Sequence, residues 1–482
     1  MNSTHQLWTS REASSATNGT SVDEWVASGV SINTRTLNPG DLFIALAGPT
    51  LDGHDFVATA FDKGAVAATV SRLPEGINAN ASLLTVKDTQ KALEDLGVAA
   101  RKRADNAQVI AVTGSVGKTG IKEALAHVLS RQGKTSASEG SLNNHWGLPL
   151  SLARIPADSD FAVLEMGMNH AGELTGLSKM ARPHVCIITT IQPAHTEYFK
   201  SLADIAKAKA EIFIGAEKNA TAVLNHDIPE YAQLVKAAKD AGIEKIISFG
   251  GDEGADVRLV SFEVGAKGSD VSVKINDKRI DYRVGIAGRH WVMNSLCVLA
   301  GVLAVNGNIE NAAKAMANIT PAKGRGERFI IKLDYGNFTL IDESYNASPA
   351  SMKAAIEVLS AEAVANGGRR IAVLGDMLEL GAETVSAHRG LAHELENSGI
   401  DMVFTVGEAM ESLWNNLPDK MKAKQFATAE LAGGYLLGIL HEGDVVMVKG
   451  SAGVRMGGIA SAIKALDQIK NSTTKEGNKD AL

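Results

Sequence analysis

The sequence predicts an α/β protein of three domains, in which helices cover mostly parallel sheets. The first observation is length, because 482 residues are enough for about three domains of roughly 150 residues each. The second is the alternation of short apolar strands with helical patterns from about residue 107 onward, which is typical of parallel sheets. The third is a glycine-containing loop between an apolar strand and a helix at 113–119, where such sheets bind phosphate groups.

The first block of the sequence, residues 1–103, combines short strands with turns. The turn Asn38–Asp41 precedes the apolar run Leu42–Leu46, which predicts a strand of a small α/β domain. The charged stretch Arg101–Asn106 interrupts the apolar pattern. It predicts a linker, and we place the end of the first domain at residue 103.

The central block, residues 104–318, and the third block, residues 319–470, repeat the alternation of strands and helices. In the central block the expected strands are Val109–Thr113, Phe161–Glu165, Val185–Thr190, Ala222–Asn225 and Ile246–Phe249. In the third block, which opens with the turn-rich stretch 320–326, they are Phe338–Ile341, Ile371–Leu374, Met402–Val406 and Val445–Val448. We expect a parallel-sheet domain and then a Rossmann-like domain, with a disordered polar tail at 471–482.

The predicted phosphate loop consists of Gly114, Ser115, Val116, Gly117, Lys118 and Thr119. In such loops backbone N–H groups bind the phosphates, the lysine reaches the terminal phosphates, and the threonine hydroxyl ligates magnesium. The following helix is predicted independently from apolar residues at helical spacing, namely Ile121, Leu125, Val128 and Leu129. Val112 stands where the strict motif has its first glycine. A strand–turn–helix that binds no ligand is therefore the alternative.

Two polar residues follow neighbouring strands of the central block. Glu165 ends the apolar strand 161–164, and His195 lies in the loop after the strand that begins at Val185. Ligands of open α/β sheets bind beyond the carboxyl ends of the strands, and a carboxylate is a preferred magnesium ligand. We therefore predict that both residues contribute to a metal or phosphate site. The alternatives are a glutamate that points to water and an ordinary surface histidine.

Lys209 lies on the apolar face of the helix 201–213, in one stripe with Leu202, Ile205, Ala208 and Ile212. A lysine on a buried face loses solvation, so its neutral amine is favoured and becomes more nucleophilic. Such an amine can carry a carbamate, which would turn a cation into an oxygen ligand for a metal. The alternative is a lysine whose ammonium group extends along the surface into water.

Composition argues against several classes of function. The charge is mildly acidic, with 48 Lys+Arg against 55 Asp+Glu and a formal net charge of −7. With no long basic stretch, we expect no nucleic-acid partner. No apolar run approaches the roughly 18 residues of a membrane span, and the N-terminus lacks the pattern of a signal peptide. The two cysteines, in apolar stretches, predict neither a disulfide nor a metal pair. We expect a cytoplasmic monomer.

Taken together, these motifs resemble those of the Mur ligases, the ATP-dependent amide-forming enzymes of peptidoglycan assembly, over nearly the whole chain. The family has the short phosphate loop found here. Its metal-binding carboxylate corresponds to Glu165, its loop histidine to His195 and its carboxylated lysine to Lys209. The resemblance implies ATP and two magnesium ions. One ion would lie near Thr119 and Glu165, and the other near His195 and an N6-carboxylated Lys209.

Segments 142–149, 342–349, 374–381 and 449–451 extend the resemblance. They are similar to segments of family members that join D-alanyl-D-alanine to UDP-N-acetylmuramoyl-tripeptide through an acyl phosphate. The resemblance implies these two substrates and a C-terminal domain that helps to bind ATP. Its implied nucleotide residues are Asn294, Arg325, Asp342, Tyr345 and Asn346. Its implied muramoyl-peptide residues are Asn143 and Asn144, and Thr34 and Arg35 would belong to an N-terminal uridine-nucleotide-binding domain.

The chain departs from the family pattern in two places. Asn33-Thr34-Arg35 stands where the family usually has Asp-Ser-Arg, and Trp291 replaces the first asparagine of the motif Gly-x-His-Asn-x-x-Asn. From this second motif only Asn294 is assigned. Two other functions stay open: another amide ligase of the superfamily, such as folylpolyglutamate synthase, or a nucleotide-binding relative without catalysis.

Overall fold

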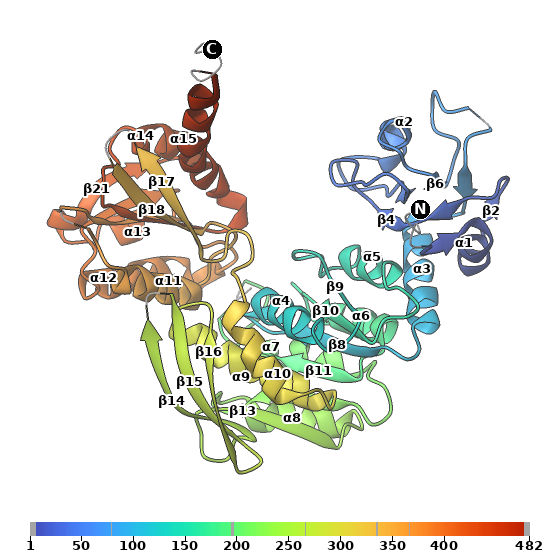
Figure 1. The fold of residues 1–482 in the computed structure, drawn as a ribbon, viewed down its shortest axis with the longest axis horizontal. Helices are drawn as coiled ribbons and strands as arrows, with labels where there is room; N and C mark the ends of the chain where they lie inside the picture. Colours follow the sequence, from blue (N-terminus) through green and yellow to red (C-terminus); the bar gives the residue numbers. More distant parts are fainter. Residues whose placement is uncertain are drawn as a thin grey trace.

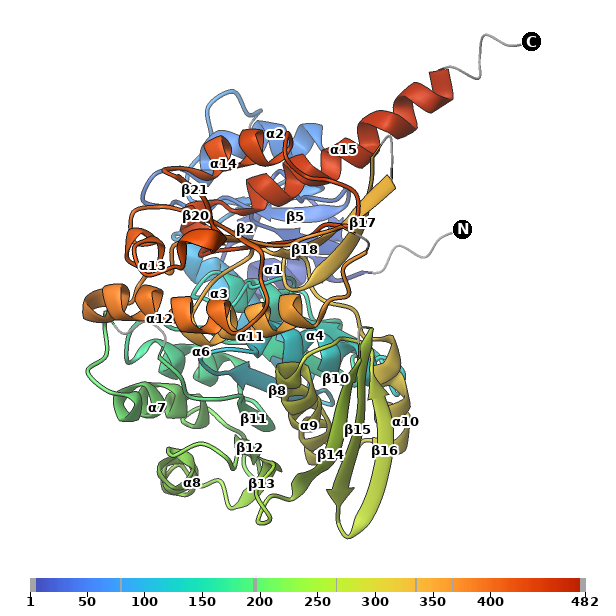
Figure 2. The same ribbon diagram turned by 90° about the vertical axis from the view of Figure 1, so that its left-hand side faces the viewer.

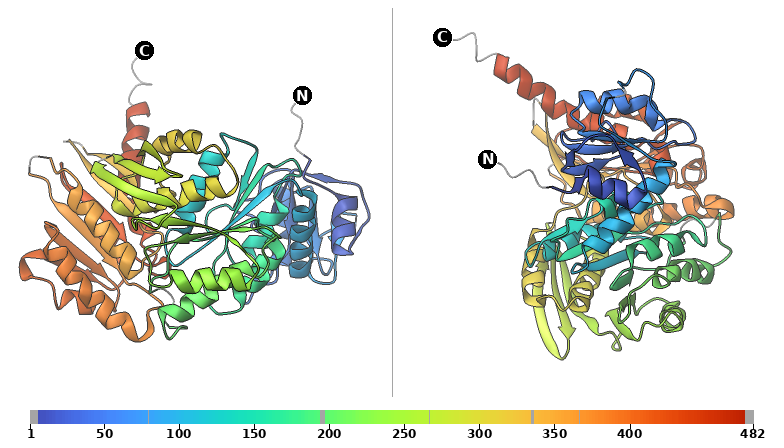
Figure 3. Two further views of the ribbon diagram at one scale, coloured as in Figure 1. Left: turned by 90° about the horizontal axis from the view of Figure 1, so that it is seen from below. Right: turned by 90° about the vertical axis from the view of Figure 1, so that its right-hand side faces the viewer.

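The computed structural model describes residues 6–78, 80–193, 197–265, 267–333, 336–365 and 367–476. Within these residues it has three large sheets, of five, nine and six strands, and one two-stranded ribbon. Most neighbouring strands are parallel and helices cover the sheets (Figure 1), so the predicted α/β fold is confirmed. Figure 3 shows the nine-stranded sheet and its helices between the other two units. No described helix has the length and apolar character needed to cross a membrane.

The N-terminal sheet has the strand order β2-β7-β6-β5-β4. Its elements are β2 (Thr20–Ser21), β4 (Gly29–Ser31), β5 (Asp41–Ile44), β6 (Ala67–Val70) and β7 (Leu83–Thr85), with α1 (Ser10–Thr17), η1 (Gly53–Phe56), α2 (Val57–Asp62) and α3 (Thr89–Arg103). The ribbon pairs β1 (Trp8–Thr9) with β3 (Val26–Ala27). The Trp8 indole donates a hydrogen bond to the carbonyl of Ala153 at 2.9 Å, which ties this unit to the central one.

The central sheet has the order β16-β15-β14-β13-β12-β11-β8-β10-β9. Its strands are β8 (Gln108–Thr113), β9 (Thr135–Ala137), β10 (Phe161–Glu165), β11 (Val185–Ile188), β12 (Thr221–Asn225), β13 (Lys245–Gly250), β14 (Val257–Gly265), β15 (Gly268–Ile275) and β16 (Lys278–Val284). Its helices are α4 (Lys118–Leu129), α5 (Gly147–Ala153), α6 (Glu173–Ala181), α7 (Leu202–Ala210), η2 (Glu211–Phe213), α8 (Tyr231–Asp240), α9 (Arg289–Ala304), α10 (Ile309–Ala315) and η3 (Met316–Asn318).

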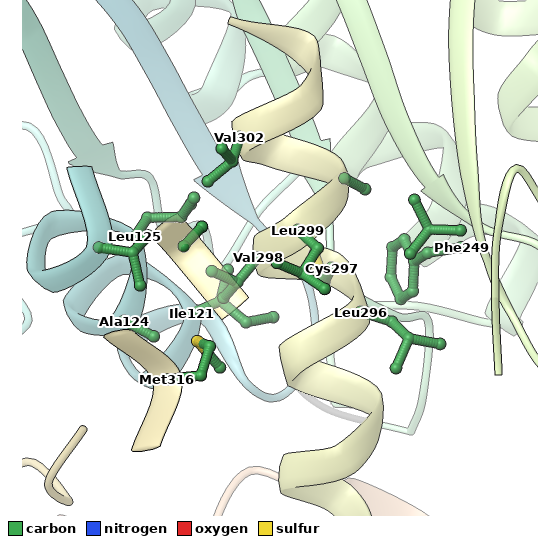
Figure 4. Packing of buried hydrophobic residues seen from close by; sticks show 14 of the residues in the cluster. Ile121, Ala124, Leu125, Phe249, Leu296, Cys297, Val298, Leu299, Val302 and Met316 are labelled. Atoms are coloured by element: carbon green, nitrogen blue, oxygen red, sulfur yellow. The ribbon is translucent and has the colours of Figure 1, made fainter. Parts of the chain in front are cut away.

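Two separate cores lie on the two faces of the central sheet. On one face α4 and α9 pack together, and Figure 4 shows Leu125 of α4 beside Val298 of α9, with Phe249 of β13 on the other side of α9. On the other face α5 to α8 cover the strands with residues such as Leu174 and Ile205. Burial on both faces explains why β8, β10, β11 and β12 appear in the sequence as nearly continuous apolar runs.

The strands β14, β15 and β16 are antiparallel and were not among the expected strands. Val271, Val273 and Ile275 of β15 are buried and alternate with polar residues. That period of two is the pattern of a sheet with one covered face. Gly268 lies at φ +139 where β14 turns into β15. The central unit therefore carries an antiparallel extension beyond its parallel strands.

The C-terminal sheet has the order β17-β18-β22-β19-β20-β21, and only β17 is antiparallel to its neighbour. Its strands are β17 (Glu327–Leu333), β18 (Gly336–Glu343), β19 (Arg370–Gly375), β20 (Met402–Val406), β21 (Lys422–Phe426) and β22 (Val445–Lys449). Its helices are α11 (Pro349–Ala361), η4 (Gly381–Glu383), α12 (Thr384–Glu396), α13 (Glu411–Trp414), η5 (Asp419–Met421), α14 (Ala429–Leu436), η6 (Ala452–Val454) and α15 (Gly457–Glu476).

Helix α15 continues to Glu476 and projects from the molecule (Figure 2). We expected a disordered tail from Asn471, so residues 471–476 differ from that expectation. After Gly458 the helix contains neither glycine nor proline, and the next glycine is Gly477. The sequence therefore holds no residue that would stop the helix earlier. Residues 477–482 lie outside the described residues.

Candidate active site

Two neighbouring cavities lie between the central and C-terminal units. The larger, of about 950 Å³, has walls from α4, from the connection 319–325 and from the start of α15. The smaller, of about 620 Å³, contains the phosphate loop and faces β18, α11 and the segment 378–380, and we call it the phosphate-loop cavity. Both share Thr119, Ser141, Trp291, Gly324, Arg325, Tyr345 and Ala452. The two cavities are thus joined at the first turn of α4.

The phosphate loop follows β8 directly, and its two glycines are required by its shape. Gly114 and Gly117 lie at φ +147 and +86, a region that favours glycine. A Cβ on Gly114 would also overlap the hydroxyl of Thr189. The Ser115 hydroxyl donates to the carbonyl of Gln192 at 2.9 Å, which fixes the loop against the segment after β11. The loop is therefore held open and rigid at the carboxyl end of the sheet.

Lys118 is the first residue of α4 and folds back over the loop. Its ammonium donates to the carbonyl of Gly114 at 2.7 Å. Burial lowers the pKa of Lys118, and Glu165 opposes that effect. A lysine in this position is placed to exchange its carbonyl partner for a phosphate oxygen.

Thr119, in the first turn of α4, and Glu165, at the end of β10, lie together. The Thr119 hydroxyl donates to one carboxylate oxygen of Glu165 at 2.8 Å, and the Asn143 amide donates to the other at 2.7 Å. Ser141 Oγ lies 3.3 Å from the Thr119 hydroxyl. Glu165 is only 1% exposed. The group is a buried, oxygen-rich set beside the phosphate loop, which is the donor chemistry that magnesium prefers.

Lys209 is buried on α7, with 2% of its surface exposed. Burial lowers the pKa of its amine well below the usual range, and the charge of Lys118 lowers it further. Burial therefore disfavours the charged form of this amine. His195, the fourth predicted metal ligand, lies outside the described residues.

The predicted nucleotide residues come from both units. The Arg325 guanidinium lies 4.1 Å over the Tyr345 ring and donates to Ser141 Oγ at 3.3 Å, across the gap between the units. The carboxylate of Asp342 accepts hydrogen bonds from the N–H and the hydroxyl of Ser344. It also forms an ion pair with Lys464, whose ammonium nitrogen lies 2.6 Å from a carboxylate oxygen. Asn294 of α9 lies against Gly117, and Asn346 lines the phosphate-loop cavity. The structure therefore gathers all five around the two cavities.

The predicted muramoyl-peptide residues are spread more widely. Asn143 lines the phosphate-loop cavity, whereas Asn144 accepts hydrogen bonds from the N–H groups of Trp146 and Gly147 at the start of α5. Thr34 and Arg35 lie in the turn after β4 and line neither cavity. In that turn the side chain of Asn33 accepts from the N–H of Arg35 at 2.9 Å. Asparagine thus supplies the turn-forming oxygen that an aspartate would supply there.

Sequence reasoning assigned no role to several residues of the site. Trp291 is buried, touches Gly120 and forms a wall of both cavities, so this departure from the family pattern replaces a polar group with an apolar surface. Lys449, at the end of β22, is 2% exposed, and burial lowers its pKa while Glu343 opposes that effect. Burial also lowers the pKa of His290. The sequence feature that could have identified Lys449 as a site residue is its position at the end of a predicted strand.

The fold and the site define a multidomain α/β protein with two cavities between a phosphate-loop unit and a second α/β unit. Three family models match the chain: the Mur ligase middle domain at 112–302, the glutamate ligase domain of Mur ligases at 324–452, and the model described as Mur ligase family, catalytic domain, at 26–103. A relative from Rickettsia prowazekii, UDP-N-acetylmuramoyl-tripeptide–D-alanyl-D-alanine ligase, is 36% identical over 89% of this chain and 93% of its own length.

Solved structures agree with these relatives. The chain superimposes on MurF from Acinetobacter baumannii with a TM-score of 0.80 and 31% identity, covering 95% of this chain and 99% of the other. It superimposes on the MurF ligase of Thermotoga maritima, determined in complex with ADP, with a TM-score of 0.73 and 26% identity. This match covers 92% of this chain and 98% of the other. The chain belongs to the Mur ligase family.

Proposed function

We propose that this chain joins D-alanyl-D-alanine to UDP-N-acetylmuramoyl-tripeptide and converts ATP to ADP and phosphate. The relatives that share most of its length carry the name of this reaction. The observation in the site that carries the proposal is the group of Thr119, Glu165 and Asn143 beside the phosphate loop, with hydrogen bonds of 2.8 and 2.7 Å. It joins a phosphate-binding element to a buried carboxylate, as phosphoryl transfer requires.

ATP would lie between the central and C-terminal units. Its phosphates would bind the N–H groups of 114–119 and the ammonium of Lys118, which already lies 2.7 Å from a loop carbonyl. Arg325 and Tyr345 form a cation–π pair on the opposite wall, next to Asp342, and would contact the rest of the nucleotide. The Thermotoga maritima relative was determined in complex with ADP, which supports the binding of an adenine nucleotide by this chain.

The oxygen-rich group beside the loop fits magnesium, which prefers hard oxygen ligands. Thr119 and Glu165 would hold one ion, and His195 and Lys209 would hold a second. When bound, magnesium offsets the negative charge of the transferring phosphoryl group.

Lys209 needs a covalent change to become a metal ligand. Its amine is buried, which lowers its pKa. In its neutral form this amine would add to CO₂ through a new C–N bond and release one proton, giving a carbamate whose two oxygens carry the negative charge. A free lysine amine is cationic in water, whereas the carbamate is an anion. This exchange suits a site that must hold a cation, and it explains why a lysine is buried beside Lys118.

The reaction would proceed in two steps. The terminal carboxylate of the tripeptide attacks the γ-phosphorus of ATP, the bond to ADP breaks, and an acyl phosphate forms. The amine of D-alanyl-D-alanine then attacks the acyl carbon, a C–N bond forms, phosphate leaves, and the amine loses a proton. Acyl phosphates hydrolyse in water, so closure of the C-terminal unit on the central one would both exclude water and align the amine.

The N-terminal unit would hold the other end of the nucleotide-sugar substrate. Thr34 and Arg35 lie in a turn that Asn33 fixes, and they would contact the UDP group. Asn143 would contact the peptide near the phosphate loop, where its amide already contacts Glu165. Since the side-chain oxygen of Asn144 caps α5, Asn144 would act mainly by fixing the segment that carries Asn143.

The test is phosphate release by the full chain with ATP, magnesium and UDP-N-acetylmuramoyl-tripeptide, with and without D-alanyl-D-alanine. We expect sustained release only when both substrates are present, together with formation of the pentapeptide product. Release that depends on a folate substrate instead would assign the chain to the folylpolyglutamate synthases. Nucleotide binding without release under any of these combinations would leave a non-catalytic relative and would overturn the proposal.

A further inference from the structure

The segment 139–154 of the central unit is bound to the N-terminal unit through two polar side chains. The Arg154 guanidinium donates from Nε to the carbonyl of Val30 in β4 at 2.7 Å. The Trp146 indole donates to the side-chain oxygen of Gln90 in α3 at 2.9 Å. These two hydrogen bonds hold the segment against both the sheet and the long helix of the N-terminal unit.

Helix α5, inside this segment, belongs to two cores at once. All seven of its residues are buried. Leu150 and Ala153 pack in the core of the N-terminal unit, whereas Leu148 and Leu152 pack in the core that α5 to α8 form on the central sheet. Figure 1 shows α5 near α3, where the two units meet. Since protein interiors are close-packed, a shift of the N-terminal unit must move α5 with it.

The other end of the segment reaches the candidate active site. Ser141 Oγ lies 3.3 Å from the Thr119 hydroxyl and accepts a hydrogen bond from the Arg325 guanidinium at 3.3 Å. The Asn143 amide donates to Glu165 at 2.7 Å. The segment 139–154 thus contacts the phosphate-loop group, the C-terminal unit and the N-terminal unit.

Arg154 connects the two ends of the segment directly. Besides its bond to Val30, its guanidinium donates from Nη1 to the carboxylate of Glu139 at 2.6 Å. Val30 lies three residues before Asn33, in the strand that leads to the turn proposed for the UDP group, and Glu139 lies two residues before Ser141. One side chain therefore joins the strand before that turn to the start of the loop that contacts the phosphate-loop group.

Another contact across the same boundary leads away from the site. Arg101 of α3 donates to the carbonyl of Ala181, at the end of α6, at 2.9 Å. Helix α6 lines neither cavity. The segment 139–154 differs, because Ser141 and Asn143 line the phosphate-loop cavity.

We propose that the segment 139–154 couples the two substrate sites, with Arg154 and Trp146 as the positioning residues. Binding of the UDP-linked tripeptide to the N-terminal unit then strengthens binding of the magnesium nucleotide at the phosphate loop. Coupling between two binding sites is reciprocal, so the nucleotide strengthens binding of the UDP-linked substrate by the same factor. This inference rests on the function proposed above and adds the residues through which the two substrates affect each other.

The coupling follows from what each end of the segment holds in place. A substrate bound at the turn 33–35 fixes β4, and β4 fixes Arg154 and the buried helix α5. With α5 and Arg154 fixed, Ser141 and Asn143 stay in contact with the threonine and the carboxylate beside the phosphate loop. The oxygen-rich group is then already arranged when the magnesium nucleotide arrives, so less order must be imposed on binding.

The test is titration calorimetry of ADP with magnesium, with and without saturating UDP-N-acetylmuramoyl-tripeptide. ADP lacks the γ-phosphate that the tripeptide carboxylate would contact, so direct contact between the two ligands is avoided. For the wild type we expect the substrate to lower the Kd for ADP about fivefold or more. For Arg154→Gln and Trp146→Phe we expect a wild-type Kd for ADP alone and little or no lowering by the substrate. A wild-type Kd that ignores the substrate, or variants that keep the full effect, would overturn the proposal.

Further variants separate coupling from simple loss of structure or of substrate contact. Gln90→Ala removes the hydrogen bond of Trp146 from the other side, so it should reduce the coupling as Trp146→Phe does, and the double variant should lose no more. Arg279→Gln breaks an exposed ion pair with Asp281 in β16, which lines neither cavity, and should keep the wild-type coupling.

The remaining outcomes are also distinct. Thermal melting identifies any variant that loses its fold, and the mildest change, Gln90→Ala on the surface of α3, then decides. Weaker binding of the UDP-linked substrate with unchanged coupling would show that the altered residues only contact that substrate, and it would overturn the proposal. Failure of the wild-type chain to bind UDP-N-acetylmuramoyl-tripeptide would instead refute the proposed function.

Discussion

The buried position of Lys209 makes the proposed carbamate testable at a single residue. The Lys209→Ala variant removes the amine, so no carbamate can form, and we expect kcat to fall by about 100-fold or more. Stability should change little, because burial disfavours the charged form of Lys209 in the folded protein. Steady-state rates and thermal melting measure the two effects. Short carboxylic acids such as acetate should restore part of the activity, and full activity in the untreated variant would refute the carbamate.

Asp52 is a second residue with a specific expectation, here for stability against acid. It accepts from the N–H of His54 at 2.9 Å and pairs with the His54 ring and with Arg72. The His54 N–H, followed by the side chains of Arg72 and His54, holds the pKa of Asp52 well below its usual value of 3.8. A depressed carboxylate pKa stabilises the folded state above the unfolded value, and this stabilisation is lost as pH falls.

The Asp52→Asn variant should therefore melt below the wild type near neutral pH. The difference in Tm between the two proteins should narrow once the pH drops below 3.8, the usual value of the carboxyl, because the carboxyl of the unfolded wild-type chain then binds a proton while that of the folded protein stays ionised. Thermal melting of both proteins across a pH series measures this difference. A gap in Tm that stays constant down to the acid limit would show that the charge of Asp52 is unimportant.

At the scale of elements, the sequence predicted the buried parallel strands better than the rest. β10 was expected with the bounds that the structure has, and β8 was expected one residue shorter, without Gln108, since strands covered on both faces are continuous apolar runs. The antiparallel strands β14 to β16 were missed, because they are half exposed and the helix–strand alternation was extended through them. Helix α15 was cut short because a polar composition was taken for disorder. Both errors come from inferring tertiary burial from composition.

The phosphate loop is an element whose shape depends on one glycine. Gly114→Ala would place a Cβ against Thr189 and require a φ of +147 that alanine rarely adopts. We expect loss of nucleotide binding by titration calorimetry and a lower Tm. The control is Gly176→Ala on the exposed side of α6, where a Cβ meets no atom within 4 Å. That variant should bind nucleotide normally and gain up to about 1 kcal/mol of stability. Equal behaviour of the two variants would contradict this account.

At the scale of the whole molecule, the sequence indicated the fold class and the family, but not how the units meet. Thr119 of the phosphate-loop motif and Glu165 at the end of β10 could be paired in advance, because the loop after β8 and the end of the neighbouring parallel strand lie at the same edge of the sheet. The contact between Arg325 and Ser141 joins residues 184 positions apart in different units. No local pattern encodes such a contact.

The proposed nucleotide cleft has walls from two units. Binding of a nucleotide should therefore change the protection of both units against hydrogen exchange. We expect ADP with magnesium to slow hydrogen exchange in the phosphate loop and α4 of the central unit, and at 342–346 and the start of α15 in the C-terminal unit. At a hundredfold excess over Kd the stabilisation is about 2.7 kcal/mol. The N-terminal sheet, which lines neither cavity, should stay unchanged with ADP and become protected with the UDP-linked substrate. Protection by ADP that is confined to the central unit would refute a site shared between the two units.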